Sequence, residues 1–140
     1  MKETKKSSAN TFLWYHLPVI LYGIGIFILS SISDLNAPDL GFDPQDKFYH
    51  FMFYTPFGYF LGRSLSSQNY FLKVKEKYWI LAVIFGLLYG ISDEIHQYYV
   101  PGRIMSLWDA VANGLGICLG VYLYHHRSRI FSFFLRKDQR

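Results

Sequence analysis

A long apolar stretch without charged residues is the feature that most constrains the fold of this chain. Residues 11–32 contain no Lys, Arg, Asp or Glu. A helix of that length spans the hydrocarbon core of a bilayer, which needs about 20 residues. Three more apolar runs follow at residues 48–62, 78–92 and 107–124, with Asp109 as their single charge. The sequence therefore predicts an all-α, polytopic membrane protein with four transmembrane helices.

A water-soluble four-helix bundle is the competing interpretation of these runs. Each helix of such a bundle carries a polar stripe opposite its apolar face. Here the segments at residues 19–29 and 79–88 are apolar on every side, which suits lipid better than water. Aromatic residues make up 20% of the chain. Many of them lie near the ends of the expected spans, where interfacial rings gather, so we prefer the membrane interpretation.

The distribution of basic residues predicts the orientation of the four helices. Most lysines and arginines lie in the head, in the connector between the second and third helices, and in the tail. The opposite side of the membrane holds only Lys47 and Arg103. The positive-inside rule therefore predicts cytoplasmic termini, with a basic head (residues 1–10), a four-helix membrane domain (11–126) and a basic tail (127–140). Because this topology accounts for the net charge of +4, we expect no nucleic-acid partner.

Capping signals predict where the first two helices lie. The first is expected at residues 11–31, with Pro18 in its opening turns, where proline costs little. The second is expected to begin with Asp43 as N-cap and Pro44 at the first helical position, and to end near Ser66.

The third and fourth helices are predicted to flank a tight turn. The third is expected at residues 78–97. In the turn at residues 100–103, proline sets φ and the glycine after it takes a positive φ. Ser106 and Asp109 form a capping-box pattern that starts the fourth helix, which is expected to end near His126.

Polar side chains gather where the second helix begins, the third ends and the fourth begins. The predicted topology brings these three places together at the outer leaflet. The residues are Asp46, Lys47, His50, Tyr54, Tyr89, Asp93, Glu94, His96, Gln97, Arg103, Asp109 and Asn113. Ionisable groups at membrane depth are costly, and by default they mark a functional site. We therefore predict an outward-facing polar pocket.

Three small-residue motifs predict which helices pack together. Gly-x-x-x-Gly occurs at residues 58–62, 86–90 and 116–120, once in each helix that carries polar residues of the pocket. Such motifs allow helix backbones to approach closely inside a membrane. We expect these three helices to pack against one another and the first helix to flank them.

Three motifs in the polar helices resemble those of the VanZ-like family. They are D-K-F-Y-H-F-x-x-Y from Asp46, Y-G-I-S-D-E-I-H-Q-x-x-V-P-G-R from Tyr89, and S-x-x-D-x-x-A-N-x-x-G from Ser106. The resemblance covers residues 30–120 and implies a small integral protein of the bacterial cytoplasmic membrane. The namesake of the family is linked to low-level resistance to teicoplanin, a lipoglycopeptide that acts on cell-wall precursors. No catalytic assignment comes with the resemblance.

The leading hypothesis is a pocket that binds a lipid-linked or lipid-tailed molecule of the cell envelope, and in its catalytic version also processes it. Arg103 and Lys47 would hold an anionic head group, and the acyl chain would pass Tyr54 and Tyr89 between the second and third helices. The acid–base candidates are Glu94, Asp93, His50 and His96. The other ligand-binding candidates are Asp46, Tyr54, Tyr89, Gln97, Asp109 and Asn113.

Other functions stay open at this stage. The protein could be a non-catalytic accessory protein that shields or binds cell-wall precursors or partner proteins. We expect no cofactor; a less favoured alternative is a metal ion held by His50, Asp93, Glu94 and His96, whose side chains suit zinc or manganese. A transporter is the least favoured function because the chain shows no internal repeat. The sequence does not indicate an oligomeric state.

Each polar residue also has a purely structural interpretation. Asp46 and Asp109 could serve only to stabilise helix starts. Arg103 could form an ion pair with Asp93 or Glu94 across the turn, since buried charges need partners.

Overall fold

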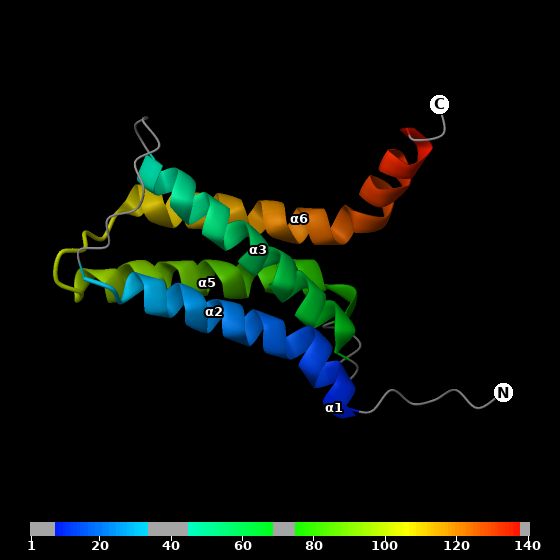
Figure 1. Ribbon diagram of the computed structural model, residues 1–140, viewed down its shortest axis with the longest axis horizontal. Coiled ribbons are helices and arrows are strands. Elements are labelled where there is room, and N and C mark those ends of the chain that lie inside the picture. The colour runs from blue at the N-terminus through cyan, green and yellow to red at the C-terminus, as the bar shows by residue number, and fades with distance from the viewer. Residues whose placement is uncertain (1–7, 34–44, 69–74, 138–140) are drawn as a thin grey trace.

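The computed structural model describes residues 8–33, 45–68 and 75–137, which form a helical bundle (Figure 1). In chain order its helices are α1 (Ser8–Thr11), the π-helical turn η1 (Phe12–His16), α2 (Leu17–Ser30), α3 (Gln45–Ser67), α5 (Tyr78–Tyr98) and α6 (Leu107–Lys137). No strand occurs in these described ranges, so the all-α prediction is confirmed. The predicted cap at Asp43 and Pro44 lies outside them, as does most of the basic head.

A π-helical turn accommodates Pro18 inside the first long helix. The sequence placed this proline in the opening turns, but the helical segment already begins at Ser8. Proline lacks an N–H, and its ring crowds the carbonyl of the preceding turn. In the widened turn the N–H of Leu17 donates to the carbonyl of Phe12, so the chain enters α2 without a break.

The last helix is longer than the sequence analysis predicted. Helices α3 and α5 end close to their predicted ends, whereas α6 runs to Lys137, past the expected end at His126. Residues 127–137 contain neither glycine nor proline, so they lack the usual residues that end a helix. The final part of α6 turns away from the bundle (Figure 1).

Three helical segments are long and apolar enough to cross a membrane: Ala9–Ser30, Tyr78–Tyr98 and Leu107–Ser128. Helix α3 is of similar length, but it carries Asp46 and Lys47 near its start and is less apolar. The structure therefore confirms the membrane-helix character of the chain for three of the four helices that were predicted to span.

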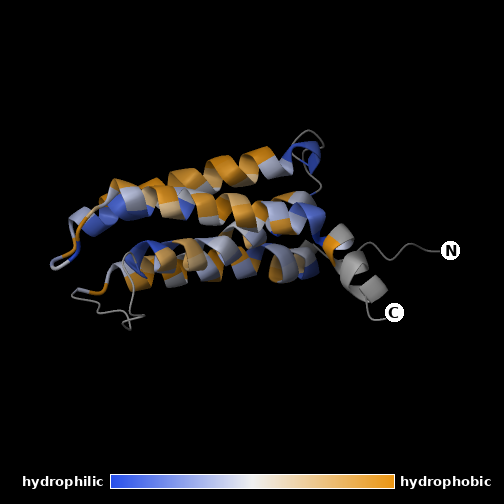
Figure 2. Ribbon diagram, turned by 90° about the horizontal axis from the view of Figure 1, so that it is seen from above, coloured by the Kyte–Doolittle hydropathy of each residue, from blue (hydrophilic) through white to orange (hydrophobic). Residues whose placement is uncertain are grey.

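Large apolar side chains lie on the outside of the bundle. Leu21, Leu88 and Leu115, on three different helices, are each more than half exposed. Figure 2 shows apolar residues along much of the length of the helices. A water-soluble monomer rarely exposes so much apolar surface. The exterior therefore favours a lipid environment, as the uncharged runs predicted.

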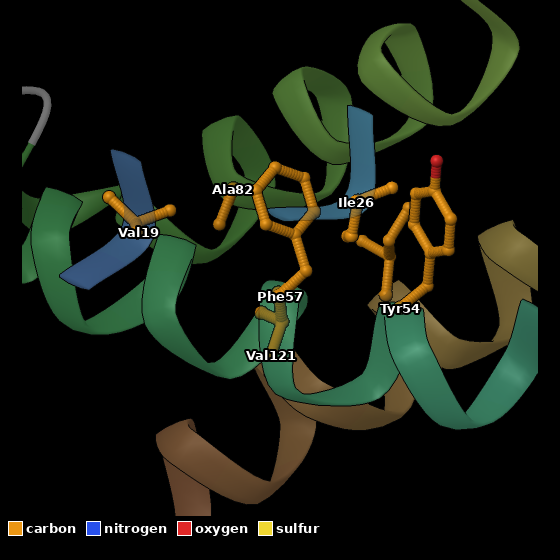
Figure 3. Close-up of a cluster of buried hydrophobic side chains, with 7 residues drawn as sticks. Val19, Ile26, Tyr54, Phe57, Ala82 and Val121 are labelled. Carbon is orange, nitrogen blue, oxygen red and sulfur yellow. The ribbon is translucent and has the colours of Figure 1, made fainter. Parts of the chain in front are cut away.

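A small apolar core joins all four long helices (Figure 3). Its buried residues are Val19 and Ile26 of α2, Tyr54 and Phe57 of α3, Ala82 of α5, and Ile117 and Val121 of α6. The hydroxyl of Tyr89 in α5 also donates to the carbonyl of Gly23 in α2, at 2.7 Å. Helix α2 is thus attached to the other three by packing and by a hydrogen bond.

Glycines bring α3 and α6 into direct backbone contact. A Cβ atom at Gly58 would overlap the backbone of Ile117, and one at Gly120 would overlap the carbonyl of Thr55. Helix α5 joins them at Gly86, where a Cβ atom would lie 2.6 Å from the Ile117 side chain. The predicted packing of the three Gly-x-x-x-Gly helices is confirmed.

The direction of the chain alternates from one long helix to the next (Figure 1). The C-terminal ends of α2 and α5 therefore lie beside the N-terminal ends of α3 and α6. The turn between α5 and α6 has the predicted form: Gly102 has a φ of 76°, and the N–H of Arg103 donates to the carbonyl of Val100 at 3.1 Å. This end of the bundle holds the polar residues.

The close approach of α3 and α6 predicts a contrast between two glycine substitutions. Gly120→Ala places a methyl group against the α3 backbone and should lower the free energy of unfolding by about 1–3 kcal/mol, the usual range for overpacking. Gly25→Ala is the matched control because no atom lies within 4 Å of its added Cβ. Thermal unfolding of the purified variants in detergent, followed by circular dichroism, measures both. Equal stability of the two variants would contradict the packing described here.

Candidate functional site

Nine polar residues meet at the end of the bundle formed by the starts of α3 and α6 and the end of α5. This polar cluster consists of Asp46, Lys47, His50, Tyr54, Asp93, Glu94, Gln97, Asp109 and Asn113. Six of its members are at most 4% exposed, namely Tyr54, Asp93, Glu94, Gln97, Asp109 and Asn113. Burying polar groups costs free energy unless they are hydrogen-bonded or paired. Their partners therefore indicate what the cluster can do.

Asp93 is held by two side chains. The hydroxyl of Tyr54 donates to Asp93 Oδ2 at 2.8 Å, and the amide of Gln97, one turn further along α5, donates to the same oxygen at 3.4 Å. The other oxygen, Oδ1, is buried and accepts no hydrogen bond from the described residues. Asp93 thus connects α5 to α3 and retains one free acceptor.

Glu94 accepts hydrogen bonds from α6 and from the turn before it. The Asn113 amide donates to Oε1, and the backbone N–H of Ser106 donates to Oε2, both at 3.3 Å. His50 Nδ1 lies 3.5 Å from Oε1 and 3.0 Å from Asn113 Oδ1. Glu94, His50 and Asn113 therefore form a triad contributed by three helices, with Glu94 and Asn113 buried and His50 partly exposed.

Lys47 bridges two carboxylates nearer the surface. Its ammonium lies 2.9 Å from Asp109 Oδ1 and 3.6 Å from Asp46 Oδ2. On the other side of Asp46, Oδ1 is 3.9 Å from His50 Nε2. Asp46 is the most accessible of these groups, with a side chain 59% exposed, whereas Asp109 is almost fully buried. His50 therefore lies between an exposed carboxylate and the buried Glu94.

The capping box predicted at the start of α6 is only half present. Ser106 Oγ accepts a hydrogen bond from the N–H of Asp109 at 3.4 Å, as an N-cap should. The returning bond is absent, because the Ser106 N–H donates to Glu94 and the Asp109 carboxylate pairs with Lys47. Asp109 is therefore not only a capping residue.

Two of the predicted site residues face α2 instead of the cluster. His96 Nε2 lies 3.0 Å from Ser31 Oγ, and its ring stacks on Phe27 with centroids 4.5 Å apart. Tyr89 donates to Gly23, as described above. Because His96 points toward α2, the metal-ligand set of His50, Asp93, Glu94 and His96 is not brought together.

The ion pair considered for Arg103 is not present. Arg103 Nη2 donates to the carbonyl of Leu29 at 3.0 Å, near the C-terminus of α2. No ion pair joins it to Asp93 or Glu94, although all three residues are described. A cation at a helix C-terminus satisfies a free carbonyl and complements the helix dipole. Arg103 thus secures α2 against the α5–α6 turn.

An apolar groove of about 460 Å³ runs along α2, and its lining residues do not include members of the polar cluster. Its walls come from α2, α3 and α5: Val19, Ile20, Gly23, Ile24, Phe27, Phe57, Leu61 and Tyr89. The sequence predicts an acyl-chain path between the second and third helices, past Tyr54 and Tyr89. The fully buried Tyr54 does not line this groove, and the walls include five residues of α2.

The contribution of α2 to this end of the molecule was missed at first because that helix carries no charge. A signal was available in its spacing. Val19, Gly23, Phe27 and Ser30 recur every three or four residues and so lie on one helical face. Val19, Gly23 and Phe27 of this face line the groove, and Phe27 also contacts His96.

The arrangement favours positive or hydrogen-donating groups. The cluster contains four carboxylates, those of Asp46, Asp93, Glu94 and Asp109, but its only permanently positive side chain is Lys47. The His50 ring lies between the exposed Asp46, 3.9 Å from Nε2, and the buried Glu94, 3.5 Å from Nδ1. Carboxylate and imidazole side chains are common general acids and bases in enzymes.

A comparison with protein families agrees with these features. A model of the VanZ/LLP1 family matches residues 2–132, nearly the whole chain. The chain belongs to the VanZ/LLP1 family. Searches of curated proteins and of solved structures gave no match. The resemblance inferred from the polar motifs is confirmed. Membership of the VanZ/LLP1 family does not by itself identify a substrate.

The partners of Asp93 predict the effect of removing one hydroxyl. Tyr54→Phe deprives a buried carboxylate of its shortest hydrogen bond and should lower the free energy of unfolding by about 1–3 kcal/mol. Tyr122→Phe is the control, because this tyrosine lies on the surface of α6. Thermal unfolding in detergent compares them. If Tyr54→Phe is as stable as Tyr122→Phe, the bond to Asp93 does not hold the helices together.

Proposed function

We propose that this VanZ/LLP1 family member binds a lipid-tailed molecule of the cell envelope, with the head group at the polar cluster and the tail in the groove. The main support is that an apolar surface adjoins a polar one. Tyr89 lines the groove, and its ring centroid is 6.4 Å from that of Tyr54, whose hydroxyl donates to Asp93. A ligand with an apolar tail and a polar head matches this order of surfaces.

The charges of the cluster narrow the choice of head group. Lys47 is already paired with Asp109, and Arg103 is bound to the Leu29 carbonyl. An anionic head group would have to compete for Lys47 with a buried carboxylate. A head group with hydroxyl or ammonium donors meets free acceptors instead, such as Asp93 Oδ1. We therefore favour a sugar- or amine-bearing head group, such as that of a lipid-linked cell-wall precursor.

The proposed location is the bacterial cytoplasmic membrane, with four spans, cytoplasmic termini and an outward-facing cluster. The excess of basic residues in the head, the 67–77 connector and the tail supports this orientation. Helix α1 and the end of α6 lie at the same end of the bundle, which agrees with an even number of crossings (Figure 1). Helix α3 would then be the fourth span, with its polar residues turned toward the other helices.

Cysteine labelling tests this orientation. In a Cys118→Ala background, Met105→Cys between α5 and α6 should react with a membrane-impermeant maleimide in intact cells. Ser67→Cys at the end of α3 should react only after the cells are permeabilised. The reverse pattern would place the cluster in the cytoplasm, and labelling of both in intact cells would contradict a fourth span.

A catalytic version of the function assigns the proton transfer to Glu94 and His50. Glu94 is 1% exposed, and His50 connects it to the accessible Asp46. His96 is hydrogen-bonded to Ser31, so we assign it no part in the proton transfer. Asp93 would orient the ligand through its free oxygen.

A non-catalytic binding protein is the second candidate. Most donors and acceptors of the cluster satisfy one another, as in a site built for shape and stability. Such a protein would bind a cell-wall precursor and shield it from a lipoglycopeptide. This is the form of the function that would account for a link to teicoplanin resistance.

Native mass spectrometry of the purified protein tests the lipid site. Ile24→Trp fills the groove and should remove most of the co-purifying lipid. Ile28→Trp, on the same helix and also exposed, lies outside the groove and should retain it. Equal lipid content in the two variants would contradict the proposal.

The same experiment separates the two candidate functions. Glu94→Gln keeps the size of the side chain but removes its charge. Accumulation of a lipid of different mass from that bound by the wild type supports processing. An unchanged lipid supports the binding protein.

A further inference from the structure

We propose that Asp46, His50 and Asp109 bind a divalent transition-metal cation at the mouth of the polar cluster, and that the Lys47 ammonium competes with this cation. The site shares its end of the bundle with the proposed function. It needs no lipid ligand, however, so either proposal can fail without the other.

The three side chains already have the composition and proximity of a metal site. One ligand atom from each lies within 4.8 Å of the other two. An imidazole nitrogen with two carboxylates suits zinc or manganese. Zinc ligands at about 2.0–2.2 Å lie roughly 3.3 Å apart in a tetrahedral site, so the three groups need to close by about 1.5 Å. Asp46 is exposed in the first turn of α3, and its rotation can supply that closure.

The hydrogen bonds of Asn113 determine which nitrogen of His50 is free. The Asn113 amide nitrogen faces two acceptors, Glu94 Oε1 at 3.3 Å and the Gly90 carbonyl at 3.5 Å. Asn113 Oδ1 therefore faces His50, and His50 Nδ1 must carry the hydrogen that this oxygen accepts at 3.0 Å. In the neutral imidazole, Nε2 then holds a lone pair.

That lone pair faces a carboxylate. His50 Nε2 lies 3.9 Å from Asp46 Oδ1, and two groups that only accept hydrogen bonds do not attract each other unless a cation lies between them. Ligating histidines typically donate their other N–H to a carbonyl or carboxylate, which fixes the ring. Asn113 and Glu94 give His50 this support.

Lys47 lies where it would compete with a metal ion. Its ammonium contacts Asp109 and Asp46, two of the three proposed ligands. Asp109 Oδ1 is buried and lies 2.9 Å from this ammonium. The Lys47 side chain is 34% exposed, so its flexible stem can swing outward when a doubly charged ion takes its place. Three protein ligands leave further coordination positions open for water or for a ligand.

Titration of tag-free protein in detergent with Mn²⁺, with the free ion followed by electron paramagnetic resonance, tests the site. Wild-type protein should bind one ion. Lys47→Met removes the competing charge and should lower the Kd about tenfold. His50→Asn keeps a donor for Asn113 but removes the Nε2 ligand, and should raise the Kd about tenfold or more. His96→Gln, on the α2 side, should bind like the wild type.

Several results would overturn the proposal. One is that neither the wild type nor Lys47→Met binds Mn²⁺ stoichiometrically. Another is that Lys47→Met leaves the Kd unchanged or raises it. A third is that His50→Asn binds Mn²⁺ as tightly as the wild type. Thermal unfolding with and without Mn²⁺ shows whether each variant is folded. Lys47→Met is a gain-of-binding variant, so misfolding cannot mimic its expected result.

Discussion

Because Gly58, Gly116 and Gly120 lack side chains, the backbones of α3 and α6 approach until they touch. In a bilayer, where lipid is as apolar as leucine, close packing of this kind replaces the hydrophobic effect between helices. The approach also sets the distances at the polar end. Lys47 and Asp109 lie in the first turns of the two helices and can form a 2.9 Å pair only because the axes are close.

The polar cluster is stable because its groups satisfy one another across three helices. Each buried carboxylate is bound by a residue from outside its own helix. Tyr54 of α3 donates to Asp93, the N–H of Ser106 before α6 donates to Glu94, and Lys47 of α3 forms an ion pair with Asp109. Helix α2 stays outside this network. Tyr89 and Arg103 hold it by donating hydrogen bonds to its backbone carbonyls. That looser attachment leaves the groove beside the network, so one architecture provides both a polar and an apolar surface.

The positions of most helices and the identity of the polar end were predictable, because uncharged runs and glycine spacing are direct consequences of membrane packing. The direction in which individual side chains point was less predictable. His96 and Gln97 are neighbours, yet a rotation of about 100° per residue directs Gln97 to Asp93 and His96 to Ser31. An ion pair with Asp93 or Glu94 was one alternative considered for Arg103, but its guanidinium donates to the Leu29 carbonyl instead. Such choices depend on tertiary geometry that the sequence pattern does not contain.

We propose that the cluster and the groove form one site for one amphiphilic ligand. A cryo-electron microscopy structure of the protein in lipid nanodiscs, bound to an antibody fragment for size, tests this most directly. We expect density for a tail between α2 and the pair α3–α5, continuous with a polar end beside Asp46 and Asp93. Lipid density only on the outer faces of the bundle, with α2 closed over Phe57 and Tyr89, would contradict the account.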